Sequence, residues 1–196
     1  DTTAIYKSTI YNPSEQKWIL SEDNRLMDAA DVVLAFGSGY KQILRQSSNY
    51  TDMTLKLSDI TVSTNSNYGT YMTTDPATYQ YWHAKWNTEK NGWELFYQEW
   101  GKYLTLTYNS TTKKYEWVVT KEKSEGSYLQ FNDGLISATV DGVPKYLGNL
   151  SGDGPYEAVD KDSSNITKFR IYTKQYTEPE NYIILKKKNT SAAVEN

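Results

Sequence analysis

The chain has 196 residues, a formal net charge of −3 and no cysteine. This length suits one well-cored domain, and the lack of cysteine excludes disulfides and thiolate chemistry. The one basic run, Lys186 to Lys188, is too short for the concentrated positive face that nucleic acid requires, and no apolar stretch is long enough to cross a bilayer. We therefore expect no nucleic-acid partner and no membrane insertion.

The first third of the chain predicts two strands and one short helix. Ile5, Tyr6 and Ile10 predict an N-terminal strand that ends before Pro13. Residues 21–30 predict one or two helical turns, because Ser21 stands as an N-cap ahead of acidic residues. The apolar run 31–37, bounded by glycine, predicts a buried strand.

The middle of the chain predicts strands joined by tight hairpins. Alternation at Leu55 and Leu57, and at Ile60 and Val62, is weak but strand-like. Aromatic residues are dense over 79–86, and the Asn-Gly pair at 91–92 predicts a hairpin into the next strand. A polar loop at 109–114 joins a further pair of strands around Leu106 and Trp117.

One short pattern occurs three times, as Gly-Lys-Tyr-Leu at 101–104, Gly-Ser-Tyr-Leu at 126–129 and Pro-Lys-Tyr-Leu at 144–147. We interpret it as a structural corner whose leucine enters the core. Two Asp-Gly pairs, at 133–134 and 141–142, lie between the second and third copies. Because Asp-Gly between apolar runs favours a primed hairpin turn, 128–147 is predicted to form three consecutive antiparallel strands.

The last part of the chain predicts two strands and a polar tail. Residues 169–172 form the first, and 182–185 form the second, which would hide two sheet edges by pairing with the N-terminal strand. The resulting domain prediction is a strand and linker at 1–17, one all-β binding domain at 18–188, and a linker at 189–196. We expect that the chain is part of a longer multidomain protein.

The order of these motifs resembles a class of non-catalytic β-rich modules in exported surface proteins of gut bacteria. The resemblance is carried by Trp18 and Leu20, the strand at 31–34, the Gly-Lys-Tyr-Leu at 101–104, and the Phe-Arg-Ile-Tyr-Thr-Lys at 169–174. The repeated Tyr-Leu corners also look like a β-trefoil. The fold prediction is therefore a single closed antiparallel β domain, a β-trefoil-like barrel, with a β-sandwich as the alternative. The resemblance implies an extracellular or cell-surface location.

Catalytic and metal chemistry have little support in the sequence. His83 is the single histidine, and its aromatic neighbours favour a packed or interface role over that of a general base. A mostly helical molecule, or a deep cleft in which His83 meets two acids, would contradict the interpretation as a non-catalytic β domain. The spacing of Asp160 and Asp162 fails the EF-hand pattern, which leaves an irregular calcium site with Asp153, or a solvated acidic loop. No enzyme, metal or cofactor is predicted.

The candidate binding site is the aromatic band, because Tyr and Trp serve both as sugar platforms and as anchors in protein interfaces. Its predicted residues are Tyr79, Tyr81, Trp82, His83, Trp86 and Trp100. Trp93 and Trp117 are instead expected in the core. The leading hypothesis is a recognition module for a host protein or glycoprotein, with immunoglobulin as one candidate. A carbohydrate-binding module attached to a glycan-degrading enzyme and a structural spacer remain the alternatives.

Overall fold

The structure is a computed structural model that describes residues 5–7, 15–177 and 186–188. Its contacts divide the chain into two units, Trp18–Lys174 and the terminal segments Asp1–Lys17 with Gln175–Asn196. In the terminal unit, β1 (Ile5–Lys7) pairs antiparallel with β17 (Lys186–Lys188). The strand predicted at 182–185 and the linker predicted at 189–196 lie outside the described residues.

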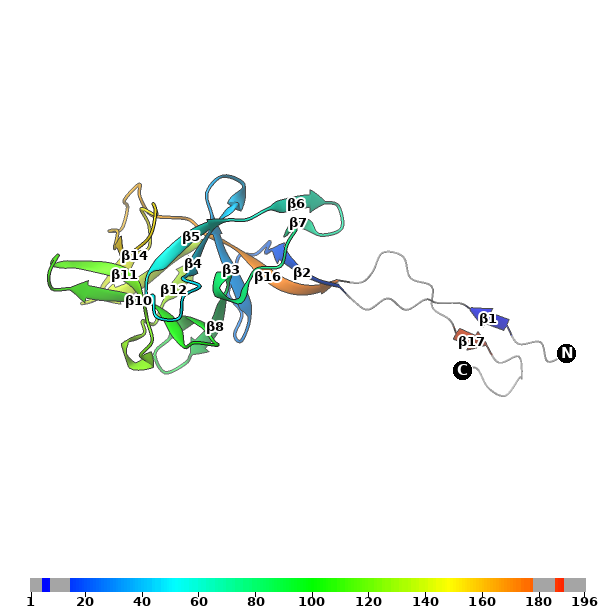
Figure 1. Cartoon of the computed structure of the whole chain (residues 1–196), viewed down its shortest axis with the longest axis horizontal. Coiled ribbons are helices and arrows are strands. Elements are labelled where there is room, and N and C mark those ends of the chain that lie inside the picture. Colours follow the sequence, from blue (N-terminus) through cyan, green and yellow to red (C-terminus); the bar gives the residue numbers. More distant parts are fainter. Residues whose placement is uncertain (1–4, 8–14, 178–185, 189–196) are drawn as a thin grey trace. The chain divides into compact units, whose positions relative to one another are not determined.

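The larger unit is built from antiparallel strands and three short 3-10 turns (Figure 1). The first strands are β2 (Glu15–Leu20), β3 (Asp31–Phe36), β4 (Gln42–Gln46), β5 (Leu55–Asp59), β6 (Val62–Asn65) and β7 (Gly69–Met72). The central hairpins are β8 (Trp82–Asn87), β9 (Gly92–Tyr97), β10 (Lys102–Asn109) and β11 (Lys114–Thr120). The last strands are β12 (Gln130–Asn132), β13 (Leu135–Val140), β14 (Val143–Tyr146), β15 (Tyr156–Glu157) and β16 (Arg170–Thr177). The 3-10 turns are η1 (Ser38–Tyr40), η2 (Thr78–Gln80) and η3 (Lys123–Glu125).

Strand β3 lies at the centre of the main sheet. It pairs with β16 along one edge, and with β8 and then β4 along the other. Figure 1 shows β3 surrounded by these three strands. Its side chains from Val32 to Ala35 are fully buried, which confirms the predicted buried strand.

The alternation of β3 builds a hydrophobic cluster on each face of the sheet. Val32, Leu34 and Phe36 belong to the main core, which also contains Trp82 and Trp117. Val33 and Ala35 point to the opposite face, into a second cluster with Trp18, Ile43, Met72 and Tyr172. Successive residues of a strand point to opposite faces, so a strand buried on both sides reads as a continuous apolar run.

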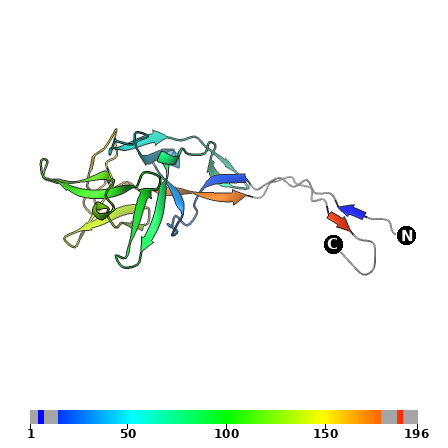
Figure 2. The ribbon, with the colours of Figure 1, turned by 60° about the horizontal axis from the view of Figure 1, so that its bottom comes forward.

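Three hairpins share one loop design. Their registers leave four-residue loops between β8 and β9, between β9 and β10, and between β10 and β11. Each loop ends on a residue with positive φ: Asn91 at 51°, Gly101 at 57° and Lys113 at 59°. In Figure 2 the β8–β9 and β10–β11 hairpins leave the sheet in different directions. Gly101 of the Gly-Lys-Tyr-Leu pattern therefore closes a hairpin loop.

The three-stranded sheet β12–β13–β14 confirms the prediction for 128–147. Asp133 and Gly134 have φ of 52° and 80°, and Asp141 and Gly142 have φ of 50° and 79°. Positive φ at both central residues is the signature of a type I′ hairpin turn. The pattern's three leucines, Leu104, Leu129 and Leu147, are all fully buried, as expected for core residues.

The predicted closed trefoil barrel is not shown by the described strands. Their pairing forms an open path from β15 to β6, with β4 and β5 branching from β3 and a separate three-stranded sheet. This all-β antiparallel arrangement is consistent with the alternative, a β-sandwich.

The prediction of a helix at 21–30 was wrong, because Asn24 in this segment is hydrogen-bonded to Phe169 and Ile171. Ser21 Oγ does accept a hydrogen bond from the Asn24 backbone N–H, at 3.2 Å, as a cap would. Asn24, however, has a φ of 51°. Its side-chain amide donates to the Phe169 carbonyl at 2.9 Å and accepts from the Ile171 N–H at 3.0 Å. The Asn24 side chain thus bonds to the backbone at the start of β16, and the segment forms a loop.

Candidate functional site

A row of directly paired residues crosses the sheet on the face that carries the second cluster. Asp31 of β3 pairs with His83 of β8, which pairs with Phe96 of β9, which pairs with Tyr103 of β10. Directly paired residues project to the same face of a sheet. The His83 and Phe96 rings meet edge-on with centroids 5.3 Å apart, and the Phe96 and Tyr103 rings stack at 5.1 Å. We call these four residues the cross-strand row.

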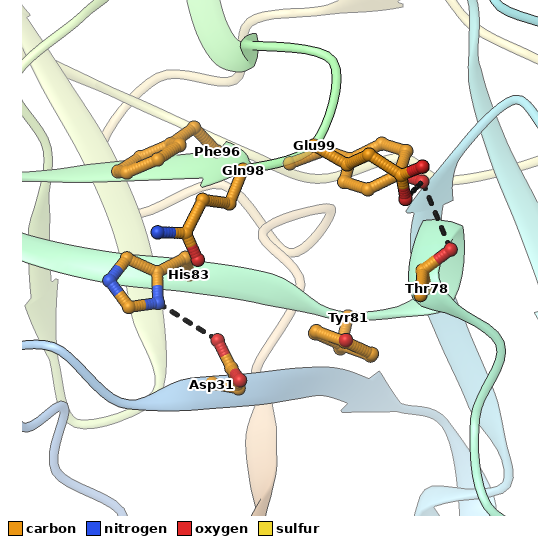
Figure 3. Close-up of a pocket in the computed structure, with 8 residues that line it drawn as sticks. Asp31, Thr78, Tyr81, His83, Phe96, Gln98 and Glu99 are labelled. Atoms are coloured by element: carbon orange, nitrogen blue, oxygen red, sulfur yellow. Dashed lines mark hydrogen bonds and ion pairs between the residues drawn. The ribbon is translucent and has the colours of Figure 1, made fainter.

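A pocket of about 250 Å³ opens at the Asp31 end of this row (Figure 3). The β-strands supply Asp31, His83, Phe96 and Tyr97, while Tyr81 and Gln98 lie just outside strand ends. The complete lining is Asp31, Thr78, Tyr81, His83, Phe96, Tyr97, Gln98 and Glu99. The pocket therefore combines aromatic rings with two carboxylates and is fixed by the register of β3, β8 and β9.

Two hydrogen-bonded groups hold the pocket in shape. His83 Nδ1 lies 2.9 Å from Asp31 Oδ1. Tyr97 Oη donates to Glu99 Oε2 at 2.7 Å and accepts from Thr78 Oγ1 at 3.0 Å. In Figure 3 the Tyr81 side chain lies between these two groups. Each acid is thus oriented by its own neighbour.

The acids make the pocket electrostatically negative. The pKa of Tyr81 is raised, first by burial and then by the charges of Asp31 and Glu99. The pKa of Tyr97 is also raised, mainly by burial. Because a nearby negative charge disfavours a phenolate, the shift of Tyr81 shows that both carboxylates act at the same ring.

The opposite end of the row packs against the segment after η3. A Cβ on Gly126 would lie 3.4 Å from the Tyr103 Cβ, so the backbone that follows η3 packs directly on this tyrosine. The pKa of Tyr103 is raised chiefly by burial. All four residues of the row are partly exposed, and the pocket lies at the Asp31 end of the row.

The surroundings of His83 give no support to nucleophilic catalysis. An Asp-oriented histidine is the base of a catalytic triad, and it needs a hydroxyl or thiol within hydrogen-bond reach. Among the described residues that line the pocket, the one aliphatic hydroxyl is Thr78, and it bonds to Tyr97. His83 meets one acid, Asp31. Glu99, the second acid of the pocket, bonds to Tyr97.

Trp82 was predicted as a site residue, and its burial contradicts this. The side chain is fully buried in the main core, and Nε1 donates to the Leu44 carbonyl at 2.9 Å. Residues 82 and 83 point to opposite faces of β8, so only one of them can belong to the pocket. Trp82 cannot touch a partner outside the molecule.

Of the other predicted residues, Tyr81 and His83 line the pocket and three do not. Tyr79 packs beneath the Arg45 guanidinium, 5.2 Å from the ring centroid. Trp86 pairs with Trp93 near the tip of the β8–β9 hairpin, with centroids 5.1 Å apart, and both are half-buried. The Trp100 ring centroid lies 5.1 Å from that of Tyr97, a pocket residue, and 5.5 Å from that of Tyr50. The expected core position of Trp117 is confirmed, since its side chain is fully buried.

The sequence-based prediction missed Asp31, Phe96 and the acid Glu99. Asp31 lies 52 residues from His83 along the chain, and only the β3–β8 register brings the two side chains together. Phe96 did carry a local signal. It alternates with Leu95 and Tyr97 after the Asn-Gly turn, which places it opposite His83 once the hairpin register is known.

The acidic loop that was considered as an irregular calcium site forms ion pairs with lysine side chains. Asp153 Oδ2 lies 2.9 Å from Lys56 Nζ, and Asp160 pairs with Lys145. Over residues 5–7, 15–177 and 186–188, no three acidic or histidine side chains come together in an arrangement that could hold a metal ion.

A second hollow, of about 710 Å³, lies beside the loop that replaces the predicted helix. Its charged lining residues are three acids, Glu22, Asp23 and Asp133, and three bases, Arg25, Lys168 and Arg170. Their formal charges sum to zero. This hollow therefore lacks the net negative charge of the pocket at Asp31.

The part of the chain that the structure describes contains no helix with the length and apolar character of a membrane span. Comparison with protein-family models, with curated proteins and with solved structures finds no match to this chain.

Proposed function

We propose that the chain is a non-catalytic recognition module of a secreted or surface-anchored bacterial protein, and that it binds a host protein or glycoprotein. The supporting observation is the cross-strand row that ends in an aromatic, acid-lined pocket. Interfaces between proteins are enriched in aromatic anchors, and the strongest contacts fill small pockets surrounded by polar groups. The pocket at Asp31 has this composition.

The size of the pocket favours an anchor side chain over a larger ligand. Pockets for drug-sized molecules measure about 300–1,000 Å³. The present pocket, at about 250 Å³, falls below that range. One side chain of a partner fits such a volume, while the partner's surrounding surface would rest on the exposed rim around Gln98 and Glu99.

The test is binding of the full chain to purified host proteins, with immunoglobulin and a mucin-type glycoprotein as the first two. Tyr81→Ala should weaken binding at least tenfold, because an anchor contact of about 1.4 kcal/mol or more changes the dissociation constant by that factor. Tyr108→Ala is the matched control, since Tyr108 is 51% exposed and lies outside the pocket lining. Equal losses in the two variants would contradict the proposal.

A carbohydrate-binding module is the second candidate, because the lining also offers what a sugar uses. Tyr81 and Phe96 supply ring faces, while Gln98 and Asp31 supply hydrogen-bonding groups. Glycan-array binding that disappears in Tyr81→Ala, with no protein binding, would establish this candidate instead. Absence of binding to both classes would favour a spacer role.

A further inference from the structure

The pocket at Asp31 carries charge of one sign. Among its described lining residues are two acids and no lysine or arginine, so its formal charge is −2 with a neutral imidazole. The second hollow, with its three acids and three bases, provides an internal comparison. A small concave site with uncompensated negative charge concentrates cations.

Both carboxylates keep an oxygen for a ligand. Asp31 uses Oδ1 toward His83, and Glu99 uses Oε2 toward Tyr97. Over the described residues, Asp31 Oδ2 and Glu99 Oε1 have no protein partner. The Asp31 side chain is 29% exposed, so an incoming group can reach it. Charge-assisted hydrogen bonds to carboxylates are about twice as strong as neutral ones.

The rings of the pocket add a second attraction for a cation. An ammonium or guanidinium group within about 6 Å of an aromatic centroid gains about 0.5–2 kcal/mol from the negative face of the ring. Tyr81 and Phe96, which are partly exposed, supply such rings, whereas the third ring of the lining, Tyr97, is only 5% exposed. The pKa of Tyr81 is raised first by burial and then by the charges of Asp31 and Glu99.

Aromatic rings close to the pocket in sequence already carry cations of this chain. Arg45 lies over Tyr79, and Lys102 Nζ lies 4.7 Å from the Trp100 centroid. Lys121 lies over Tyr50, which is distant in sequence but contacts Trp100. Within the described residues, no lysine or arginine of the chain lies over the Tyr81, Phe96 or Tyr97 rings. Tyr81 packs against Trp18 and Phe96 stacks on Tyr103, so a cation from outside would meet the faces of these two rings that are turned away from those neighbours.

We propose that the pocket binds a cationic side chain of the partner protein, a lysine ammonium or an arginine guanidinium, which contacts the Asp31 and Glu99 carboxylates and the Tyr81 and Phe96 rings. This inference rests on the proposed function and names the group of the partner that would enter the site.

The first experiment measures binding of blocked single amino acids to the full chain by NMR titration. N-acetyl-lysine amide and N-acetyl-arginine amide are the probes, and N-acetyl-norleucine amide and N-acetyl-citrulline amide are their uncharged counterparts. We expect at least one cationic probe to shift the His83 and Tyr81 resonances at millimolar concentration, and to bind at least tenfold more tightly than its counterpart. Added salt should weaken the binding, because the attraction is electrostatic.

The variants Asp31→Asn and Glu99→Gln keep the shape of the pocket and remove its charge. Each variant should weaken binding of the cationic probe severalfold, and the double variant should weaken it at least tenfold. Asp59→Asn is the matched control, because Asp59 is an exposed acid outside the pocket lining. Thermal unfolding of each variant checks that the fold is retained.

The inference is overturned if neither cation binds, if the uncharged counterparts bind equally well, or if a methyl glycoside binds in their place. Its failure is distinguishable from failure of the proposed function. If the double variant binds the host protein normally while Tyr81→Ala does not, the pocket anchors the partner but its ligand is not a cation. If Tyr81→Ala also binds normally, the pocket is not the site.

Discussion

The two faces of the β3–β8–β9 sheet have different roles, although the same strands supply both. On one face, Val32, Trp82 and Leu95 are buried in the main core. On the other, their chain neighbours Asp31, His83 and Phe96 lie side by side at a pocket. A shift of one residue along the strand separates a core side chain from a pocket side chain.

This difference arises from what covers each face. The second cluster, with Trp18 and Tyr172, covers Val33 and Ala35 and reaches Tyr81 at the edge of the pocket, but it does not include Asp31. Beyond that end the face carries polar and aromatic groups, which tolerate partial exposure. Residues buried in the main core should therefore control stability, while residues at the pocket should control binding.

The largest expected effect is on the core face. Trp82→Ala removes a fully buried ring and the Nε1 hydrogen bond to the Leu44 carbonyl. It should lower the free energy of unfolding by about 3–5 kcal/mol. Urea denaturation measures this change, with Tyr108→Ala as an exposed aromatic control. A loss below about 1 kcal/mol would contradict the assignment of Trp82 to the core.

Alkaline pH should weaken both clusters through one tyrosine in each. Burial raises the pKa of Tyr156, in the main core, and of Tyr172, in the second cluster, to about 12. Their unfolded pKa is about 10. The protonated form is favoured by folding, so this stabilisation is complete below pH 10 and is lost as the pH rises toward 12.

The loss should be of the order of 2 kcal/mol for each tyrosine. Urea denaturation between pH 8 and pH 12 follows it, and the readout is the slope of stability against pH. Tyr156→Phe and Tyr172→Phe should each make the slope shallower, independently of their effect on stability at pH 8. An unchanged slope in either variant would show that this tyrosine is not protected from ionisation.

A smaller effect is expected within the cross-strand row. Phe96 and Tyr103 stack with centroids 5.1 Å apart on neighbouring strands. A double-mutant cycle with Phe96→Ala and Tyr103→Ala should give a coupling free energy of about 0.5–1.5 kcal/mol. Trp86 and Tyr103, which are not paired across strands, form the reference cycle and should give a coupling near zero.

The smallest effect on stability is expected at the open end of the row. His83→Gln removes the ring that bonds to Asp31, but both side chains remain partly exposed, at 17% and 29%. The free energy of unfolding should change by about 1 kcal/mol or less. Thermal unfolding near neutral pH measures this. A loss comparable to that of Trp82→Ala would show that the pocket face carries stability after all, and would remove the contrast between the faces.

Local patterns were sufficient for the strands and their turns. Residues 31–37 predicted a buried strand, and two Asp-Gly pairs predicted the β12–β13–β14 sheet, because hydrophobic runs and positive-φ turns are properties of neighbouring residues. The helix at 21–30 failed, since Asn24 is held by hydrogen bonds to Phe169 and Ile171, nearly 150 residues away. The barrel was inferred from the Tyr-Leu repeats, and the described strands do not show it, because their pairing forms an open path from β15 to β6.

The candidate site was only partly predictable for the same reason. The aromatic density of 79–86 included β8, which contributes to the pocket, but it did not separate Trp82, in the core, from His83, at the pocket. That separation depends on which face of β8 is covered, and the cover comes from remote strands.

Local patterns along the chain were enough to predict an all-β antiparallel protein, the positions of its hairpin turns, and the core positions of its leucines at 104, 129 and 147. Which aromatic residues are buried, and that Asp31 meets His83, depend on the packing of remote strands. Strand periodicity and turn chemistry are short-range, so they can be read from neighbouring residues. The pairing of β3 with β8 is long-range, and it brings the Asp31 carboxylate and the His83 ring together in the pocket.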